Sequence, residues 1–157
     1  MTNPRNKSIS VVICTFFGVG FIPFAPGTWG ALAALPLAWL IRSGLGDAIF
    51  LALTVLFFFI GAWASNCFID NVGRDDPGAI VIDEVVGQWM TLLWFPNDIT
   101  FYIIGFFLFR IFDIFKPWPI ILLDKKIKGG FGVMLDDIAA AFFSWVGIYA
   151  LLETGMI

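Results

Sequence analysis

Seven charged side chains that interrupt apolar stretches carry the candidate chemistry of this sequence. They form three groups along the chain: Asp83 with Glu84, Arg110 with Asp113 and Lys116, and Asp136 with Asp137. Five of the seven are carboxylates, which are hard oxygen ligands and repel one another unless a cation lies among them. Because the sequence has no histidine and only two cysteines, Mg²⁺ or Mn²⁺ is favoured over Zn²⁺ as that cation.

The two basic members of this set suit a phosphate group. Arg110 offers a planar fork of N–H donors, and Lys116 offers a compact positive charge. Arg110, Asp113 and Lys116 follow one another at intervals of three residues, so they share one face of a helix. A divalent metal, a guanidinium and an ammonium group together are typical of a site that handles phosphoryl groups.

A further candidate is the segment FAPGTWG, residues 24–30. Pro23, Pro26 and Gly27 forbid a continuous helix across residues 21–30. A helix that starts there would aim backbone N–H groups at a phosphate, with the Thr28 hydroxyl alongside as a substrate-binding group. The alternative is a plain helix entry in which Thr28 serves as the N-cap.

Several other chemistries are excluded by residue type. The absence of histidine excludes Ser-His-Asp hydrolysis and phosphoryl transfer through an imidazole. Cysteine-dependent phosphatases need Cys and Arg in one short loop, and the separation of Cys67 and Arg74 does not match that loop. Cys14 and Cys67 both lie in apolar runs, where a small buried thiol is the usual explanation rather than a disulfide.

The composition indicates that these charges belong to a membrane protein. The chain has 157 residues, of which 60% are hydrophobic and 13% charged, whereas soluble domains average about 45–50% and about 25%. A domain of this size could not bury so much apolar surface by folding in water. The net charge of -3 and the lack of a dense basic stripe exclude a nucleic-acid partner and a disordered chain.

The hydropathy pattern predicts an all-α fold, a polytopic integral membrane helical bundle with about four to five spans. Residues 1–157 are expected to form a single membrane-embedded domain. The apolar run at residues 9–22 is too short to cross and is predicted to be a re-entrant or interfacial segment. The expected spans are residues 29–41, 48–69, 79–96, 101–115 and 133–152. The clearest is residues 48–69, and the shortest is residues 29–41.

The orientation follows from the lysines and arginines of the short loops. Five crossings with the N-terminus in the cytoplasm leave Arg42 as the outside cation. The inside cations are then Arg5, Lys7, Arg74, Lys116, Lys125, Lys126 and Lys128. The same topology places all three charged groups near the cytoplasmic ends of their spans, so the sequence predicts one polar site at that membrane face.

Two simpler explanations of the charges stand beside this prediction. An acidic residue in the first turn of a helix stabilises the helix dipole and caps free N–H groups, which alone would account for Asp83 or Asp136. It accounts less well for two acidic pairs, since one cap needs one carboxylate. Arg110 and Asp113 could form a self-neutralising ion pair at the membrane interface.

Four segments in this order, PFAPGTWG, IVIDEVVGQW, FRIFDIFKPWPI and GGFGVMLDDIAA, resemble bacterial phosphatidylglycerophosphatase A. The resemblance covers about residues 18–145. It implies a lipid phosphatase of the bacterial inner membrane that removes the phosphate monoester of phosphatidylglycerophosphate in a Mg²⁺-dependent reaction. The family's acidic motif falls on Asp83 and Glu84, its arginine-aspartate-lysine motif on residues 110–116, and its paired aspartates on Asp136 and Asp137.

The expected roles follow from the residue types and the resemblance together. Mg²⁺ is expected to be held by some of four carboxylates: Asp83, Glu84, Asp136 and Asp137. Asp137 or Glu84 is the expected general base. Arg110 and Lys116 would bind the phosphoryl oxygens while Asp113 orients Arg110, and the partner would be a phospholipid. The sequence does not determine an oligomeric state.

Two other functions use clustered carboxylates in membranes. A metal-dependent phospholipid alcohol transferase would carry a spaced-aspartate helix motif that this sequence lacks. A cation transporter or proton relay would spread its carboxylates through the membrane depth, whereas these are predicted to lie at one side.

Overall fold

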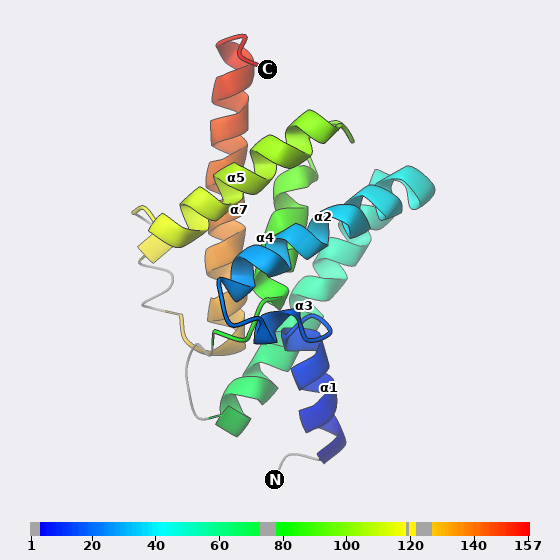
Figure 1. Cartoon of the computed structure of the whole chain (residues 1–157), viewed down its shortest axis with the longest axis vertical. Helices are drawn as coiled ribbons and strands as arrows, with labels where there is room; N and C mark the ends of the chain where they lie inside the picture. Colours follow the sequence, from blue (N-terminus) through cyan, green and yellow to red (C-terminus); the bar gives the residue numbers. More distant parts are fainter. Residues whose placement is uncertain (1–3, 73–77, 119, 122–126) are drawn as a thin grey trace.

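The computed structural model describes residues 4–72, 78–118, 120–121 and 127–157 (Figure 1), and across these ranges the regular structure is helical. The helices are α1 (Pro4–Cys14), the short 3-10 helix η1 (Val19–Phe21), α2 (Pro26–Leu45), α3 (Asp47–Val72), α4 (Ile82–Leu92), α5 (Ile99–Phe115) and α7 (Gly129–Glu153). The all-α prediction is therefore confirmed.

Helix α4 is the centre of the bundle. It packs against α2, α3, α5 and α7 (Figure 1), and nine of its eleven residues are buried. The indole N–H of Trp89 donates to the Ala34 carbonyl oxygen of α2 at 2.9 Å. On the other side, the Trp145 indole of α7 donates to the Met90 carbonyl oxygen at 2.9 Å. These contacts place the first turn of α4 between the helices that carry the other charged residues.

Two helices in the described part of the chain are long and apolar enough to cross a membrane. They are α3, over Asp47–Asp70, and α7, over Gly129–Glu153. By contrast, α4 lies in the predicted span at residues 79–96 but has only 11 residues, about 16 Å at 1.5 Å per residue. It is too short to cross a hydrocarbon core of about 30 Å by itself. The four helices that enclose α4 bury its apolar residues, so the hydropathy of this stretch resembles that of a span. The charges that interrupt the stretch lie in the first turn of α4.

The N-terminal segment is a helix followed by a reversal. Helix α1 ends at Cys14, and both Phe16 and Phe17 then take left-handed backbone conformations, with φ of 45° and 57°. The Val81 N–H donates to the Cys14 carbonyl oxygen at 2.8 Å. This bond fastens the end of α1 to the start of α4.

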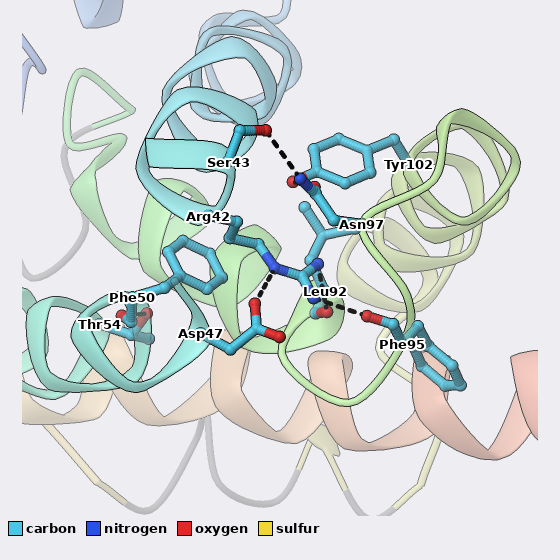
Figure 2. A network of polar contacts seen from close by, with 9 residues as sticks. All are labelled: Arg42, Ser43, Asp47, Phe50, Thr54, Leu92, Phe95, Asn97 and Tyr102. Carbon is cyan, nitrogen blue, oxygen red and sulfur yellow. Dashed lines mark hydrogen bonds and ion pairs between the residues drawn. The ribbon is translucent and has the colours of Figure 1, made fainter. Parts of the chain in front are cut away.

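The opposite end of α4 is held by the buried guanidinium of Arg42 (Figure 2). Its Nη1 and Nη2 donate to the carbonyl oxygens of Leu92 and Phe95 at 3.1 and 2.7 Å. Its Nε donates to Asp47 Oδ1 at 2.6 Å, and the cation lies over the Phe50 ring. The residue predicted as the outside cation is therefore the link between α2, α3 and the end of α4.

Two helices begin earlier than the hydropathy pattern predicts. Helix α2 begins at Pro26 rather than at residue 29, because proline is suited to the first helical position. Helix α7 begins at Gly129 rather than at residue 133. Gly130 allows this early start, since a Cβ there would lie 2.2 Å from the Ala62 carbonyl oxygen of α3. Asp136 and Asp137 consequently lie about two turns inside α7.

Candidate active site

A cavity of about 620 Å³ lies where the start of α2, the start of α4, the end of α5 and the first turns of α7 meet. All seven charged residues singled out in the sequence line this cavity: Asp83, Glu84, Arg110, Asp113, Lys116, Asp136 and Asp137. The segments that carry them are separated by up to about fifty residues. The tertiary structure therefore brings the three charged groups of the sequence into one polar space.

Three carboxylates converge within this cavity. Asp83, Glu84 and Asp137 each offer one oxygen, and these oxygens all lie within 4.8 Å of one another. In the described structure, the oxygens Asp83 Oδ1, Glu84 Oε2 and Asp137 Oδ2 are buried without a hydrogen-bond partner. Buried carboxylate oxygens that lack donors are satisfied by a cation. The three residues therefore fit a hard divalent metal.

The electrostatics of α4 support the same conclusion. Burial first, and the charge of Glu84 second, raise the pKa of Asp83 well above its usual range. Burial raises the pKa of Glu84 to about 7, partly opposed by the neighbouring Asp83 side chain. Both carboxylates thus need a nearby positive charge to remain ionised in this environment.

Arg110 supplies one such charge from α5. Its Nη1 lies 2.7 Å from Asp113 Oδ2 and 4.0 Å from Glu84 Oε1. The Arg110 and Asp113 side chains are only 12% and 11% exposed. The Arg110–Asp113 ion pair is therefore real, but it lies in the wall of the cavity, where Asp113 fixes the direction of the guanidinium.

Lys116 reaches the cavity through an unusual backbone conformation. It is the C-cap of α5 and has a left-handed φ of 40°. Its Nζ donates to Asp136 Oδ2 of α7. Asp136 is one of the four carboxylates of which some are predicted to hold the metal; it pairs with Lys116, and the three carboxylates that converge are Asp83, Glu84 and Asp137. Successive residues of a helix point about 100° apart, which separates Asp136 from Asp137.

The segment FAPGTWG contributes to the cavity through Gly27, for which the sequence predicts only a break in the helix. Gly27 lines the cavity, and a Cβ at this position would lie 1.9 Å from Glu84 Oε1 and 3.3 Å from Arg110 Nη2. Thr28 is in the first turn of α2 but is not among the cavity-lining residues, and the N-cap of α2 is Ala25. The glycine between Pro26 and Thr28 was the signal in the sequence that could have indicated this contact, because glycine allows another group to approach the backbone closely.

The helix-capping explanation applies to one acidic pair only. Asp83 and Glu84 are in the first turn of α4, where the helix dipole favours negative charge. Asp136 and Asp137 are not in the first turn of α7, so the dipole does not account for them. Among the predicted inside cations, Arg74, Lys125 and Lys126 lie outside the described residues, as do the side chains of Arg5 and Lys7.

The chain was compared with known proteins. A family model described as Phosphatidylglycerophosphatase A matches residues 12–152. A Phosphatidylglycerophosphatase A of Haemophilus influenzae is 42% identical over 86% of this chain and 83% of its own length. One of Escherichia coli K12 is 38% identical over 92% of this chain and 81% of its own. A Bacteroides thetaiotaomicron protein, provisionally named a phosphatidylinositol-3-phosphatase, is 43% identical over 90% of this chain and 92% of its own length. No solved structure matches the chain.

Proposed function

The chain belongs to the phosphatidylglycerophosphatase A family and is a phosphatase, and from this premise we propose that it hydrolyses the phosphate monoester of phosphatidylglycerophosphate. The products are phosphatidylglycerol and inorganic phosphate, which places the reaction in phospholipid biosynthesis. One observation carries the proposal. Three converging carboxylates face a guanidinium and an ammonium group in a single cavity, which is the set of groups that phosphoryl chemistry requires.

The donor set fits Mg²⁺, with Asp83, Glu84 and Asp137 as its ligands. When bound, Mg²⁺ supplies a Lewis acid that offsets the phosphate charge and makes a water molecule more acidic. Asp136 is assigned to Lys116 rather than to the metal, because the two side chains form an ion pair. This pairing keeps the Lys116 ammonium group in the cavity wall.

The cations of the chain bind and orient the phosphoryl group. Arg110 donates to the phosphoryl oxygens through the N–H groups that Asp113 leaves available, since Asp113 engages Nη1 at 2.7 Å. Lys116 adds a second positive charge from the end of α5. Both interactions strengthen as negative charge builds on the phosphoryl oxygens in the transition state, which is the condition for an effect on rate.

Hydrolysis needs one carboxylate to take a proton. Asp137 or Glu84 accepts a proton from water while the water oxygen bonds to phosphorus and the bond from phosphorus to the glycerol oxygen breaks. The leaving glycerol oxygen then takes a proton. In the other route an aspartate oxygen bonds to phosphorus as the bond to the glycerol oxygen breaks, and water then hydrolyses the phospho-aspartate to inorganic phosphate. Trapping with radiolabelled substrate distinguishes them, because only the second route leaves label on the protein.

The setting that we propose is the bacterial inner membrane, with the cavity at the cytoplasmic face. Helices α3 and α7 supply two crossings. The apolar side chains exposed along α2 and α5, such as Leu40 and Phe107, support a multi-pass arrangement of four to five spans with α4 enclosed. The excess of cations on the expected inside supports the orientation. Thr28, which follows the cavity-lining Gly27 in the chain, is a further substrate-binding candidate.

A second substrate deserves direct comparison because one relative carries a different name. The Bacteroides thetaiotaomicron protein is named for phosphatidylinositol 3-phosphate, which is also a phosphate monoester on a membrane lipid. The two substrates differ in the group that bears the phosphate, and both present the same dianion to Arg110 and Lys116.

The test is phosphate release by the purified protein in detergent. Phosphatidylglycerophosphate and phosphatidylinositol 3-phosphate are supplied separately, with Mg²⁺, with EDTA, and with Mg²⁺ restored after EDTA. Release from the first lipid that EDTA stops and Mg²⁺ restores is the expected result. Release from the second lipid alone would change the substrate. No release from folded protein, together with cation uptake in reconstituted vesicles, would favour the transporter.

A further inference from the structure

Aromatic side chains project from the segments that flank the cavity. The four most exposed large apolar side chains of the described residues are Phe17 and Phe24, each 80% exposed, Phe115 at 77% and Trp118 at 75%. Phe24 directly precedes Ala25, and Phe115 and Trp118 stand on either side of Lys116 and Pro117. We call Phe24, Phe115 and Trp118 the aromatic rim.

The backbone of both segments is shaped to expose these rings. In the described chain four residues other than glycine have a positive φ, and two of them, Ala25 at 48° and Lys116 at 40°, line the cavity. Each is the immediate neighbour of a rim residue. A left-handed residue turns the chain sharply, so one residue faces the cavity while the next side chain points outward. Such conformations are uncommon and gather at functional sites.

The cavity and the rim suit different parts of one amphipathic ligand. The cavity wall carries five carboxylates, Arg110, Lys116 and Lys128 beside apolar residues such as Ile80 and Val133, and its charged part suits a phosphate-bearing headgroup. The rim beside it is aromatic, and aromatic rings favour the boundary between membrane and water. The rim is continuous in sequence with both cavity walls that carry phosphate-binding candidates, the start of α2 and the end of α5.

We propose that the aromatic rim is a lipid-binding surface, which holds the long acyl chains of a single phospholipid while its phosphate-bearing headgroup enters the cavity. The proposal rests on the proposed function, because the headgroup is the substrate of the same site. The proposal predicts that contacts with Phe24, Phe115 and Trp118 make the KM depend on the length of the acyl chains. The rest of the apolar surface would not bind an individual substrate molecule.

The experiment separates the rim from the chemistry by using two substrates. Dioleoyl phosphatidylglycerophosphate is presented at varied mole fraction in phosphatidylcholine vesicles that contain the reconstituted protein. Dihexanoyl phosphatidylglycerophosphate is presented as a monomer in detergent solution, and its short acyl chains offer little hydrocarbon to the rim. The double variant Phe24→Ser/Trp118→Ser is compared with wild type, since neither residue lines the cavity.

The matched control is the double variant Leu40→Ser/Phe107→Ser, on α2 and α5, the helices that adjoin the rim segments; these side chains are 66% and 60% exposed. For the rim variant we expect the KM for the dioleoyl lipid to rise at least about tenfold, from the lost apolar contact. We expect its kcat, and both constants for the dihexanoyl lipid, to be unchanged. The control variant should resemble wild type with both lipids.

Three results would overturn the proposal. An unchanged KM for the dioleoyl lipid in the rim variant would mean that the rim does not contact substrate. Equal rises in KM with both lipids in the rim variant would mean that the rim acts in headgroup binding or in folding. An equal rise in KM in the control variant would mean that the effect comes from the general insertion of the protein in the bilayer. Wild-type protein that releases phosphate from neither lipid would instead contradict the proposed function, so the two failures are distinguishable.

Discussion

Asp83 and Asp137 lie on helices far apart in the sequence, yet their carboxylates share one small volume with Glu84. Each buried negative charge there is unfavourable in the absence of a cation. If the three residues hold Mg²⁺, then binding of the metal must stabilise the fold, because it binds the native state and not the unfolded chain.

The first prediction concerns Asp83→Asn and Asp137→Asn. We expect each to lower phosphate release by about 100-fold or more, since each removes a ligand from a catalytic metal. Mg²⁺ should raise the thermal unfolding midpoint of wild type and should lose this effect in the variants. The control is Glu153→Gln, an exposed carboxylate at the end of α7. Wild-type rates in both variants would remove the proposed metal site.

The second prediction concerns Arg110→Lys. Lysine keeps the charge but loses the fork that can engage Asp113 and a phosphoryl oxygen together. We expect kcat/KM to fall by about 100- to 1,000-fold, the range for loss of one transition-state donor, with normal expression and thermal stability. A lysine variant as active as wild type would show that charge alone suffices, and Asp113 would then have no orienting role.

The third prediction concerns Gly27→Ala. The added Cβ would lie 1.9 Å from Glu84 Oε1, so the carboxylate or the start of α2 must move. We expect a large loss of activity with little change in unfolding midpoint, because displacing the Glu84 carboxylate alters the site more than the core. Gly44→Ala on the same helix is the matched control, since a Cβ there meets open space. Equal activity in the two variants would refute this close approach.

At the scale of helices, α4 is fastened at both ends. Its start is joined to α1 through the bond between the Val81 N–H and the Cys14 carbonyl oxygen. Its end is joined to α2 and α3 through Arg42. A helix of eleven residues is marginal on its own, so the packing and these end contacts fix the position of Asp83 and Glu84.

The fourth prediction tests the fastening at the end of α4. Arg42→Met should lower the free energy of unfolding by about 2–6 kcal/mol, from about 1–3 kcal/mol for each of two carbonyl groups left without a donor. Denaturant unfolding in detergent micelles measures this loss. Asp47→Asn should cost much less, because that side chain is 64% exposed and exposed ion pairs contribute about 0–1 kcal/mol. Equal losses would mean that the ion pair, rather than the carbonyl contacts, stabilises this end.

At the scale of the whole molecule, α7 begins at the cavity and carries the C-terminus to the end opposite the N-terminus (Figure 1). The predicted orientation places the N-terminus and the site on the cytoplasmic side and the C-terminus on the other side. The apolar surface between the two ends is the part that a bilayer would cover.

The fifth prediction is a difference between the two termini in cells. A reporter that is active only in the cytoplasm should work at the N-terminus and fail at the C-terminus, and a reporter that is active only outside should behave in the opposite way. The reason is the passage of α7 from the site to the far face. Two termini that report the same side would contradict the five-crossing orientation.

The sequence by itself determined the helical class and the chemical inventory of the site. Uninterrupted apolar runs predict helices because a bilayer requires every backbone polar group to be bonded within its own segment. Charged residues inside such runs are costly, so Asp83, Arg110 and Asp137 could be singled out without a structure. The early starts of α2 and α7 were missed because glycine and proline at helix starts resemble loop residues in a sequence.

The tertiary structure alone decided which charges meet. On α7, the Asp137 side chain lies near Asp83 and Glu84, whereas the Asp136 side chain pairs with Lys116. The sequence does not show which of two adjacent aspartates takes which partner. The shortness of α4 and the approach of Gly27 to Glu84 are likewise properties of packing. Residue spacing fixes neighbours along one helix, whereas contacts between helices depend on how their surfaces fit together.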